Sequence, residues 1–170
     1  TKWVIDMLVD IVSRNGNLML NFPLPNSGML DCQELEVLDG ITRWMNINGE
    51  GIFSTRPWKI FGDGPIATGK SDDVTHARFN EGGRKELTAE EVRFTTKGNS
   101  LYAFVMDWPG KQAVIKPLST ASPVNPPKVL NVELLGHGGR LVWTQDIAGL
   151  TVQLPEEKPC EHAIALKLTV

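Results

Sequence analysis

The chain has 170 residues, of which 41% are hydrophobic and 22% are charged, and this balance is typical of a globular protein with one domain or two small ones. Its formal net charge is −3 and its Lys and Arg residues are scattered, so neither nucleic acid nor an anionic membrane surface is expected as a partner. No apolar run approaches the roughly 20 residues that a membrane-spanning helix requires.

The first residues predict a helix followed by a buried strand. Asn15 and Gly16 provide a helix stop after residues 2–14, because both tolerate the left-handed backbone conformation. Residues 17–22 then form an apolar run without alternation, closed by Pro23, as in a strand covered on both faces. The chain opens inside this helical pattern without a signal peptide, so we expect it to begin within a longer protein. The apolar side chains at helical spacing are Trp3, Val4, Met7, Leu8, Ile11 and Val12.

A second helix is predicted from Asp31 to about residue 47. Asp31 followed three residues later by Glu34 resembles a capping box, and Asn48 with Gly49 ends the pattern. The periodic apolar face consists of Leu35, Leu38, Ile41, Trp44 and Met45. Helix, buried strand and helix in this order are typical of an α/β barrel or a doubly wound sheet.

The pattern changes after Trp58. Polar and glycine-rich residues over 61–87 predict a linker or a long loop. Short β-type runs follow at residues 92–96, 101–107, 111–116, 128–134, 140–144, 150–154 and 162–169. Their length and the turn residues between them predict an antiparallel β-sandwich. The fold class is therefore α/β followed by all-β, and the first piece needs further elements to cover its strand.

The cysteines and histidines are not spaced as a disulfide framework or a metal site requires. Cys32 and Cys160 lie far apart and are expected to be unpaired. His76, His137 and His162 show no metal-ligand spacing, so no metal site and no cofactor are expected.

The acidic residues give no sign of a catalytic pair either. Asp6 and Asp10 lie at helical spacing opposite the apolar stripe, where a solvated outer face is expected. Asp31 is expected to serve as a helix N-cap, and no two carboxylates have a reason to share a pocket.

Four segments of the chain are informative in the order in which they occur. They are residues 8–21 (LVDIVSRNGNLMLN), Trp44 with residues 48–58 (NGEGIFSTRPW), residues 88–95 (TAEEVRFT) and residues 149–155 (GLTVQLP). Together they resemble the glycoside hydrolase family 29 α-L-fucosidases. The first two resemble that family's last barrel strand with its preceding helix and the segment after its last barrel helix, and the other two are similar to the entry into its C-terminal sandwich and to a strand near its end.

The resemblance implies the division of the chain and its activity. Residues 1–60 would form the end of a TIM-like (β/α) barrel, residues 61–87 a linker, and residues 88–170 a C-terminal β-sandwich. The implied reaction is retaining hydrolysis of terminal α-L-fucosyl residues from a fucosylated oligosaccharide or glycoconjugate. It requires two carboxyl groups about 5–5.5 Å apart. Both precede this segment in the family, so the chain alone is expected to be inactive and to need the remainder of the barrel as its partner. A periplasmic or secreted bacterial protein is implied as well.

Substrate contacts are expected at the end of the predicted strand. Active sites of such barrels form at the C-terminal ends of the strands. Asn21 would hydrogen-bond a sugar hydroxyl and Phe22 would pack against the fucose methyl, although loop packing would equally explain both residues. Arg56 and Trp58 follow a returning helix and are interpreted as packing between barrel and sandwich.

Two other interpretations of the sandwich remain open. It would be a carbohydrate-binding module if it presented Trp108 or Trp143 to glycans. It would be a purely structural module if these tryptophans packed in its core, and binding of isolated glycans would separate the two.

Overall fold

Two helices and eight strands occupy the part of the chain that the computed structural model describes, residues 1–69 and 86–170. The helices are α1 (Lys2–Ser13) and α2 (Cys32–Asn48), and short 3-10 turns follow at Gly49–Gly51 and Lys116–Leu118. The strands are β1 (Arg56–Asp63), β2 (Val92–Lys97), β3 (Ser100–Val105), β4 (Gln112–Ile115), β5 (Asn131–Leu134), β6 (Trp143–Gln145), β7 (Leu150–Gln153) and β8 (Ile164–Thr169). Neither described helix is long and apolar enough to cross a membrane.

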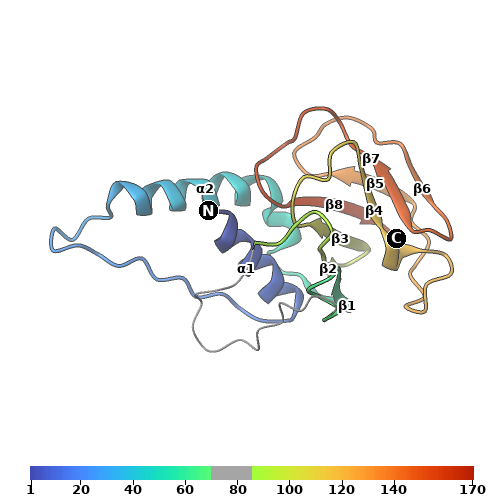
Figure 1. Cartoon of the computed structure of the whole chain (residues 1–170), viewed down its shortest axis with the longest axis horizontal. Helices are drawn as coiled ribbons and strands as arrows, with labels where there is room; N and C mark the ends of the chain where they lie inside the picture. The colour runs from blue at the N-terminus through green and yellow to red at the C-terminus, as the bar shows by residue number, and fades with distance from the viewer. Residues whose placement is uncertain (70–85) are drawn as a thin grey trace.

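The strands form two antiparallel sheets that share one apolar core. The larger sheet has the order β1-β2-β3-β8-β5, and the smaller one has the order β4-β7-β6 (Figure 1). Every pairing between neighbouring strands is antiparallel, for example Leu101 opposite Leu168 in β3 and β8. The antiparallel β-structure predicted for the C-terminal half is therefore confirmed, and we call the two sheets together the sandwich.

The larger sheet is buried on both faces. Along β3, Leu101, Ala103 and Val105 belong to the core between the sheets, whereas Tyr102 and Phe104 belong to a second core on the opposite face. Successive side chains of a strand point to opposite faces, so one strand can serve two cores. The sheet is thus a shared wall between the smaller sheet and the helices.

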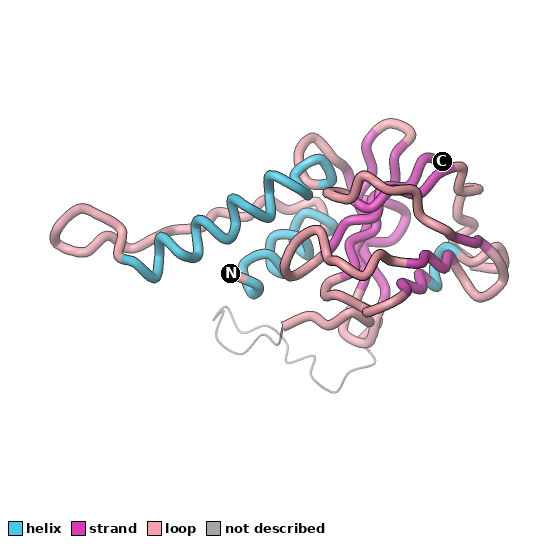
Figure 2. Tube along the Cα trace, turned by 90° about the horizontal axis from the view of Figure 1, so that it is seen from above, coloured by secondary structure: helices cyan, strands magenta, loops and turns pink. Residues whose placement is uncertain are grey.

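The helices lie beside the larger sheet and cover its outer face (Figure 2). Ile5 and Val9 of α1 and Trp44 of α2 are buried in the second core together with Phe104. The face of α1 that packs on the sheet therefore differs from the predicted apolar stripe. Ile5 and Val9 are not part of that stripe, yet they are the fully buried residues of α1 in this core.

The first strand of the sandwich begins earlier than predicted. β1 pairs with β2 over Arg56 opposite Thr96 to Asp63 opposite Val92, with an irregular register in between. The expected boundary at residue 60 consequently runs through a strand. Residues 70–85 of the expected linker lie outside the described residues.

Residues 17–22 form no strand in the described part of the chain. A strand is stable only when neighbouring strands pair with its backbone, and no described strand lies beside this segment. The strand predicted there stays a prediction for the segment in the presence of further elements.

Candidate functional site

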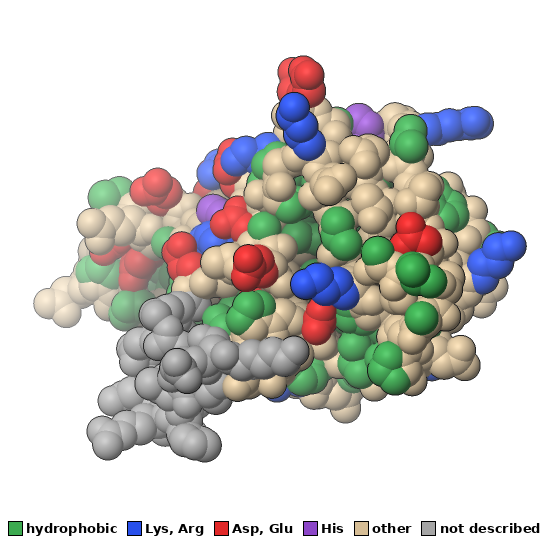
Figure 3. All heavy atoms as spheres, turned by 45° about the vertical axis from the view of Figure 1, so that its right-hand side comes forward, with side chains coloured by type: hydrophobic (Ala, Val, Ile, Leu, Met, Phe, Trp, Pro, Cys, Tyr) green, Lys and Arg blue, Asp and Glu red, His purple; other side chains and the backbone are tan. Residues whose placement is uncertain are grey.

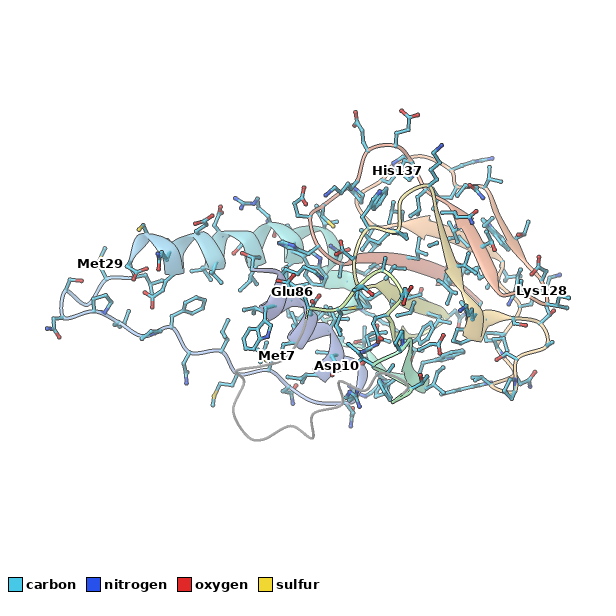
Figure 4. All side chains as sticks on the ribbon, in the orientation of Figure 1. Met7, Asp10, Met29, Glu86, Lys128 and His137 are labelled. Carbon is cyan, nitrogen blue, oxygen red and sulfur yellow. The ribbon has the colours of Figure 1, made fainter. Side chains whose placement is uncertain are left out.

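Residues 17–31, which we call the arm, carry the candidate substrate residues away from the sandwich. The arm and the N-terminal half of α2 project together, with Met29 at the far end (Figures 1 and 4). Asn21 is exposed and Phe22 is half-buried. Both residues lie outside the two hydrophobic cores of the described part of the chain.

Local sequence signals determine where the arm begins and ends. At the end of α1, Asn15 adopts φ 67°, and Gly16 N–H donates to the carbonyl of Ile11 at 2.8 Å, which closes a Schellman motif. At the start of α2, Asp31 accepts from the amide of Glu34, whose side chain accepts from the amide of Asp31. Both predicted helix ends, including the capping box, are confirmed.

The arm and α2 expose a series of large apolar side chains. Met19 is 84% exposed and Leu35 on α2 is 51% exposed. The full series is Met19, Leu20, Leu24, Met29, Leu35 and Leu38. Singly exposed apolar residues are ordinary, but six of them on one projecting segment favour an interaction surface. The predicted apolar face of α2 is thus divided, because Trp44 lies in the core while Leu35 and Leu38 remain uncovered.

Polar contacts hold the start of α1 against the sandwich. Lys2 Nζ donates to the carbonyls of Leu87 at 2.8 Å and Met106 at 2.9 Å, and it pairs with Asp6. Asp6 in turn accepts from the amide of Leu87 at 2.9 Å. Burial raises the pKa of Asp6, although these hydrogen bonds oppose the rise. The solvated face predicted for Asp6 is therefore wrong.

An ion-pair network holds the end of α1. Arg93 of β2 is 1% exposed and donates through Nε to Asp10 Oδ1 at 2.6 Å and through Nη1 to Glu91 at 2.8 Å. Arg14 pairs with the other oxygen of Asp10, and its guanidinium lies 3.7 Å from the centre of the Phe61 ring. The positive charges of Arg93 and Arg14 thus balance the negative charges of Asp10 and Glu91. The solvated face predicted for Asp10 is wrong as well, because Arg93 covers it.

The end of α2 is also tied to the larger sheet. Trp44 Nε1 donates to the carbonyl of Ala163 at 2.7 Å, and its ring lies against Phe104 with centroids 6.1 Å apart. The buried Asn48 donates to the sulfur of Cys160 at 3.4 Å. Cys160 and Cys32 are both free thiols, as predicted.

A third network links the turn after α2 to the sheet. Tyr102 donates its hydroxyl to Glu50 Oε1 at 2.7 Å, and Lys167 pairs with the same oxygen. These contacts lower the pKa of Glu50, with Lys167 as the main cause. Burial raises the pKa of Tyr102 to about 12, and the bond to Glu50 adds to the rise.

This arrangement predicts a direct optical result. Tyr102 is the only tyrosine of the chain, so its ionisation can be followed by tyrosinate absorbance. We expect a midpoint near 12 in the folded chain, and Glu50→Gln should lower it while leaving it above the ordinary value of 10.0, because burial is the larger cause.

The stability of the fold should follow the same titration. The folded state keeps the proton to higher pH than the unfolded chain, so the free energy of unfolding falls as pH rises from about 10 to about 12. A midpoint near 10 in the folded wild type would contradict the Tyr102–Glu50 contact.

The most deeply placed of the described acidic groups hold the fold together. Asp6, Asp10 and Glu91, the most deeply placed of them, are each bound by a cation or by backbone N–H groups. Within residues 1–69 and 86–170, no group of three His, Cys, Asp or Glu side chains is arranged to hold a metal ion. His76 lies outside the described residues, and His137 lies in a turn at the edge of the sandwich (Figure 4).

The tryptophans proposed as glycan contacts lie partly within the sandwich. Trp108 and Trp143 are half-buried and pack against the core between the sheets. Trp58 packs against the same core, with its ring centroid 4.9 Å from that of Phe94. This packing favours the structural interpretation of Trp108 and Trp143. It also places Trp58 inside the sandwich, where sequence reasoning had expected an interface.

Trp143 also lines a shallow groove of about 430 Å³ that no carboxylate borders. Gln145 also lines the groove, and its side chain accepts from the amide of Val129 and donates to the carbonyls of Leu118 and Pro127. On the face shown in Figure 3, acidic and basic side chains are interspersed over the surface.

Sequence reasoning missed Arg93 and Glu91. The available signal was a charged residue inside the apolar run of β2, between Val92 and Phe94. Because alternate residues face opposite sides, Arg93 had to lie on the face away from the inner core. That this face would be covered by α1 depends on a contact between residues 83 positions apart.

Comparisons with known proteins identify both parts of the chain. The family model described as the α-L-fucosidase C-terminal domain matches residues 84–169, and the model described as α-L-fucosidase matches residues 1–50.

Individual relatives agree with the family models. Tissue α-L-fucosidase of Mus musculus is 30% identical over 98% of this chain and 32% of its own length, and that of Rattus norvegicus is 29% identical over 98% and 31%. The chain thus spans about a third of the length of the curated relatives it matches. The crystal structure of Thermotoga maritima α-fucosidase in complex with a mechanism-based inhibitor shares the fold, with a TM-score of 0.72 and 23% identity over 99% of this chain and 34% of that one.

Proposed function

The chain belongs to the α-L-fucosidase family, and from this premise we propose that it forms the C-terminal third of an enzyme that hydrolyses terminal α-L-fucosyl residues of fucosylated glycans. In this proposal residues 1–55 complete a (β/α) barrel, with residues 17–22 as its last strand. The sandwich packs against the outside of that barrel through α1 and α2.

The exposed apolar side chains of the arm and α2 carry this proposal. They lie within the residues matched by the α-L-fucosidase model, and they need cover that the described residues do not supply. The remainder of a barrel would bury them, since both faces of a parallel barrel strand are covered.

The proposed reaction places the catalytic carboxylates in the remainder of the barrel. One ionised carboxylate would attack the anomeric carbon and displace the leaving group, which a second, protonated carboxyl would protonate. Water would then hydrolyse the fucosyl-enzyme with the second residue acting as base. This chain would contribute substrate contacts and part of the shape of the active site.

Asn21 and Phe22 would contribute at the C-terminal end of the last strand. Strand polarity would place both residues at the catalytic face of a barrel. Fucose has a methyl group where most hexoses have a hydroxymethyl, so an aromatic neighbour would favour it. Asn21 would donate to or accept from a sugar hydroxyl.

Two substitutions in the complete protein test this placement. We expect the wild type to hydrolyse an aryl α-L-fucoside, and Phe22→Ala to lower kcat/KM roughly 10–200-fold, the usual value of an apolar contact in a specificity pocket. Met29→Ala is the matched control, because Met29 is an apolar residue at the far end of the same arm. If both substitutions lowered kcat/KM equally, the proposed contact between Phe22 and the fucose methyl would be wrong. An inactive wild type would contradict the proposed activity.

A further inference from the structure

The last turn of α1 is held by a side chain of the sandwich. Arg93 reaches Asp10 from β2 with an Nε–Oδ1 distance of 2.6 Å, and this pair joins residues 83 positions apart. Charge-assisted hydrogen bonds of this length are among the strong contacts of a protein interior. The pair therefore fixes one point of the helix on the sheet.

Arg93 itself is held in place from several sides. Its Nη1 donates to Glu91, which also accepts from the backbone N–H groups of Ile66 and Ala67. Gly62 of β1 leaves the space that Arg93 occupies, because a Cβ at Gly62 would lie 2.8 Å from Arg93 Cδ. The guanidinium is thus pre-organised before Asp10 meets it.

The connection from Asp10 to the arm is short and closed by hydrogen bonds. Gly16 N–H donates to the carbonyl of Ile11 at 2.8 Å, and Asn15 N–H donates to Val12 at 3.0 Å. These two bonds form the Schellman motif at the end of α1. A displacement of Asp10 is consequently transmitted to the start of the arm.

We propose that Arg93 is a positioning residue of the sandwich: by holding Asp10 it sets the direction in which the chain leaves α1 toward Asn21 and Phe22. The inference rests on the proposed function, which places these two residues at the fucose pocket. It gives the sandwich a role in the reaction, because a shift of about 1 Å in a positioned group can cost up to about 100-fold in rate.

A double-mutant cycle in the complete protein tests the proposal. Asp10→Ala is expected to lower kcat/KM for an aryl α-L-fucoside roughly 10-fold or more. In a Phe22→Ala background most of this loss should disappear, because Arg93 acts through the position of Phe22. A purely structural role would give equal losses in both backgrounds, and that result would overturn the proposal.

Matched variants separate the effect from general damage. Asp39→Ala removes the corresponding exposed pair with Arg43 on α2 and should leave kcat/KM unchanged. Asp10→Asn keeps an oxygen that can accept from Arg93 Nε and should restore most of the activity. If Asp10→Ala fails to fold, Arg93→Lys is measured instead, since it keeps the buried charge but loses the planar fork.

Hydrogen exchange distinguishes this inference from the proposed activity. In the 170-residue chain, Asp10→Ala should speed exchange of the Asn15 and Gly16 amides about 10-fold or more while the β3 amides are unchanged. Unchanged exchange at Asn15 and Gly16 would overturn the inference even if the complete enzyme is active. Faster exchange in a protein without α-L-fucosidase activity would leave the anchoring intact and contradict the proposed function alone.

Discussion

Purified as a 170-residue chain, the protein is expected to show no turnover of an aryl α-L-fucoside above the uncatalysed rate. Retaining hydrolysis needs one ionised and one protonated carboxyl group about 5–5.5 Å apart across the sugar. The deeply placed carboxylates of the described residues, Asp6, Asp10 and Glu91, are bound to Lys2, Arg93 and backbone amides instead. The expected loss relative to a complete enzyme approaches the full catalytic acceleration, about 10⁶-fold or more.

The measurement compares the isolated chain with the complete protein at equal molar concentration. The identity of the chain is verified by intact mass, because a trace of active enzyme would simulate turnover. Hydrolysis by the pure chain, proportional to its concentration, would show that the carboxyl pair lies within these 170 residues.

A second large effect is expected on stability. Trp44→Ala should lower the free energy of unfolding of the 170-residue chain by about 3–5 kcal/mol, as is usual for large-to-small substitutions in a core. Trp44 is 2% exposed, packs against Phe104, and donates to the carbonyl of Ala163. Its removal would leave a cavity between α2 and the sheet, and the carbonyl of Ala163 would keep only the weak hydrogen bond from the Cys160 thiol. Urea denaturation followed by circular dichroism measures the change.

Leu35→Ala on the same helix is the control, and it also tests the proposed barrel. Leu35 is half exposed in this chain, so its truncation should change stability by only about 0.5 kcal/mol. In the complete protein the same substitution should cost about 2 kcal/mol or more, because the barrel would bury the side chain. Equal, small effects in both proteins would mean that nothing covers this face of α2.

Features determined by neighbouring residues could be predicted from the sequence. The capping box of Asp31 and Glu34 and the helix stop at Asn15 and Gly16 depend on contacts within one or two turns, and both are present. Seven of the eight described strands, β2 to β8, overlap the predicted runs, because short β-type stretches with turn residues between them mark each run.

Features that depend on distant contacts were missed. The sequence prediction divides β1 between the end of the barrel and the start of the linker, because Gly62 and Gly64 resemble a loop. Its pairing with β2, which is irregular between Pro57 and Gly62, depends on residues about 30 positions later. Asp6 and Asp10 were assigned to solvent, because the residues that bind them, Leu87 and Arg93, follow more than 80 positions later. Helical spacing alone cannot distinguish a charged face in water from one that meets a buried arginine. Asn21 and Phe22 remain predictions, since their proposed environment lies in other parts of the complete protein.

The larger sheet has a consequence for recombination between enzymes. Its outer face carries Tyr102 and Phe104, which α1 and α2 cover, so the unit that can be exchanged is larger than the segment matched by the C-terminal domain model. A chimera joined at residue 84 would pack the helices of another protein against this sheet. The hydrogen bonds between Asp10 and Arg93 and between Trp44 and Ala163 would be lost unless the other protein supplied matching residues. A junction upstream of α1 would keep the helices and the sheet together and transfer them as one unit.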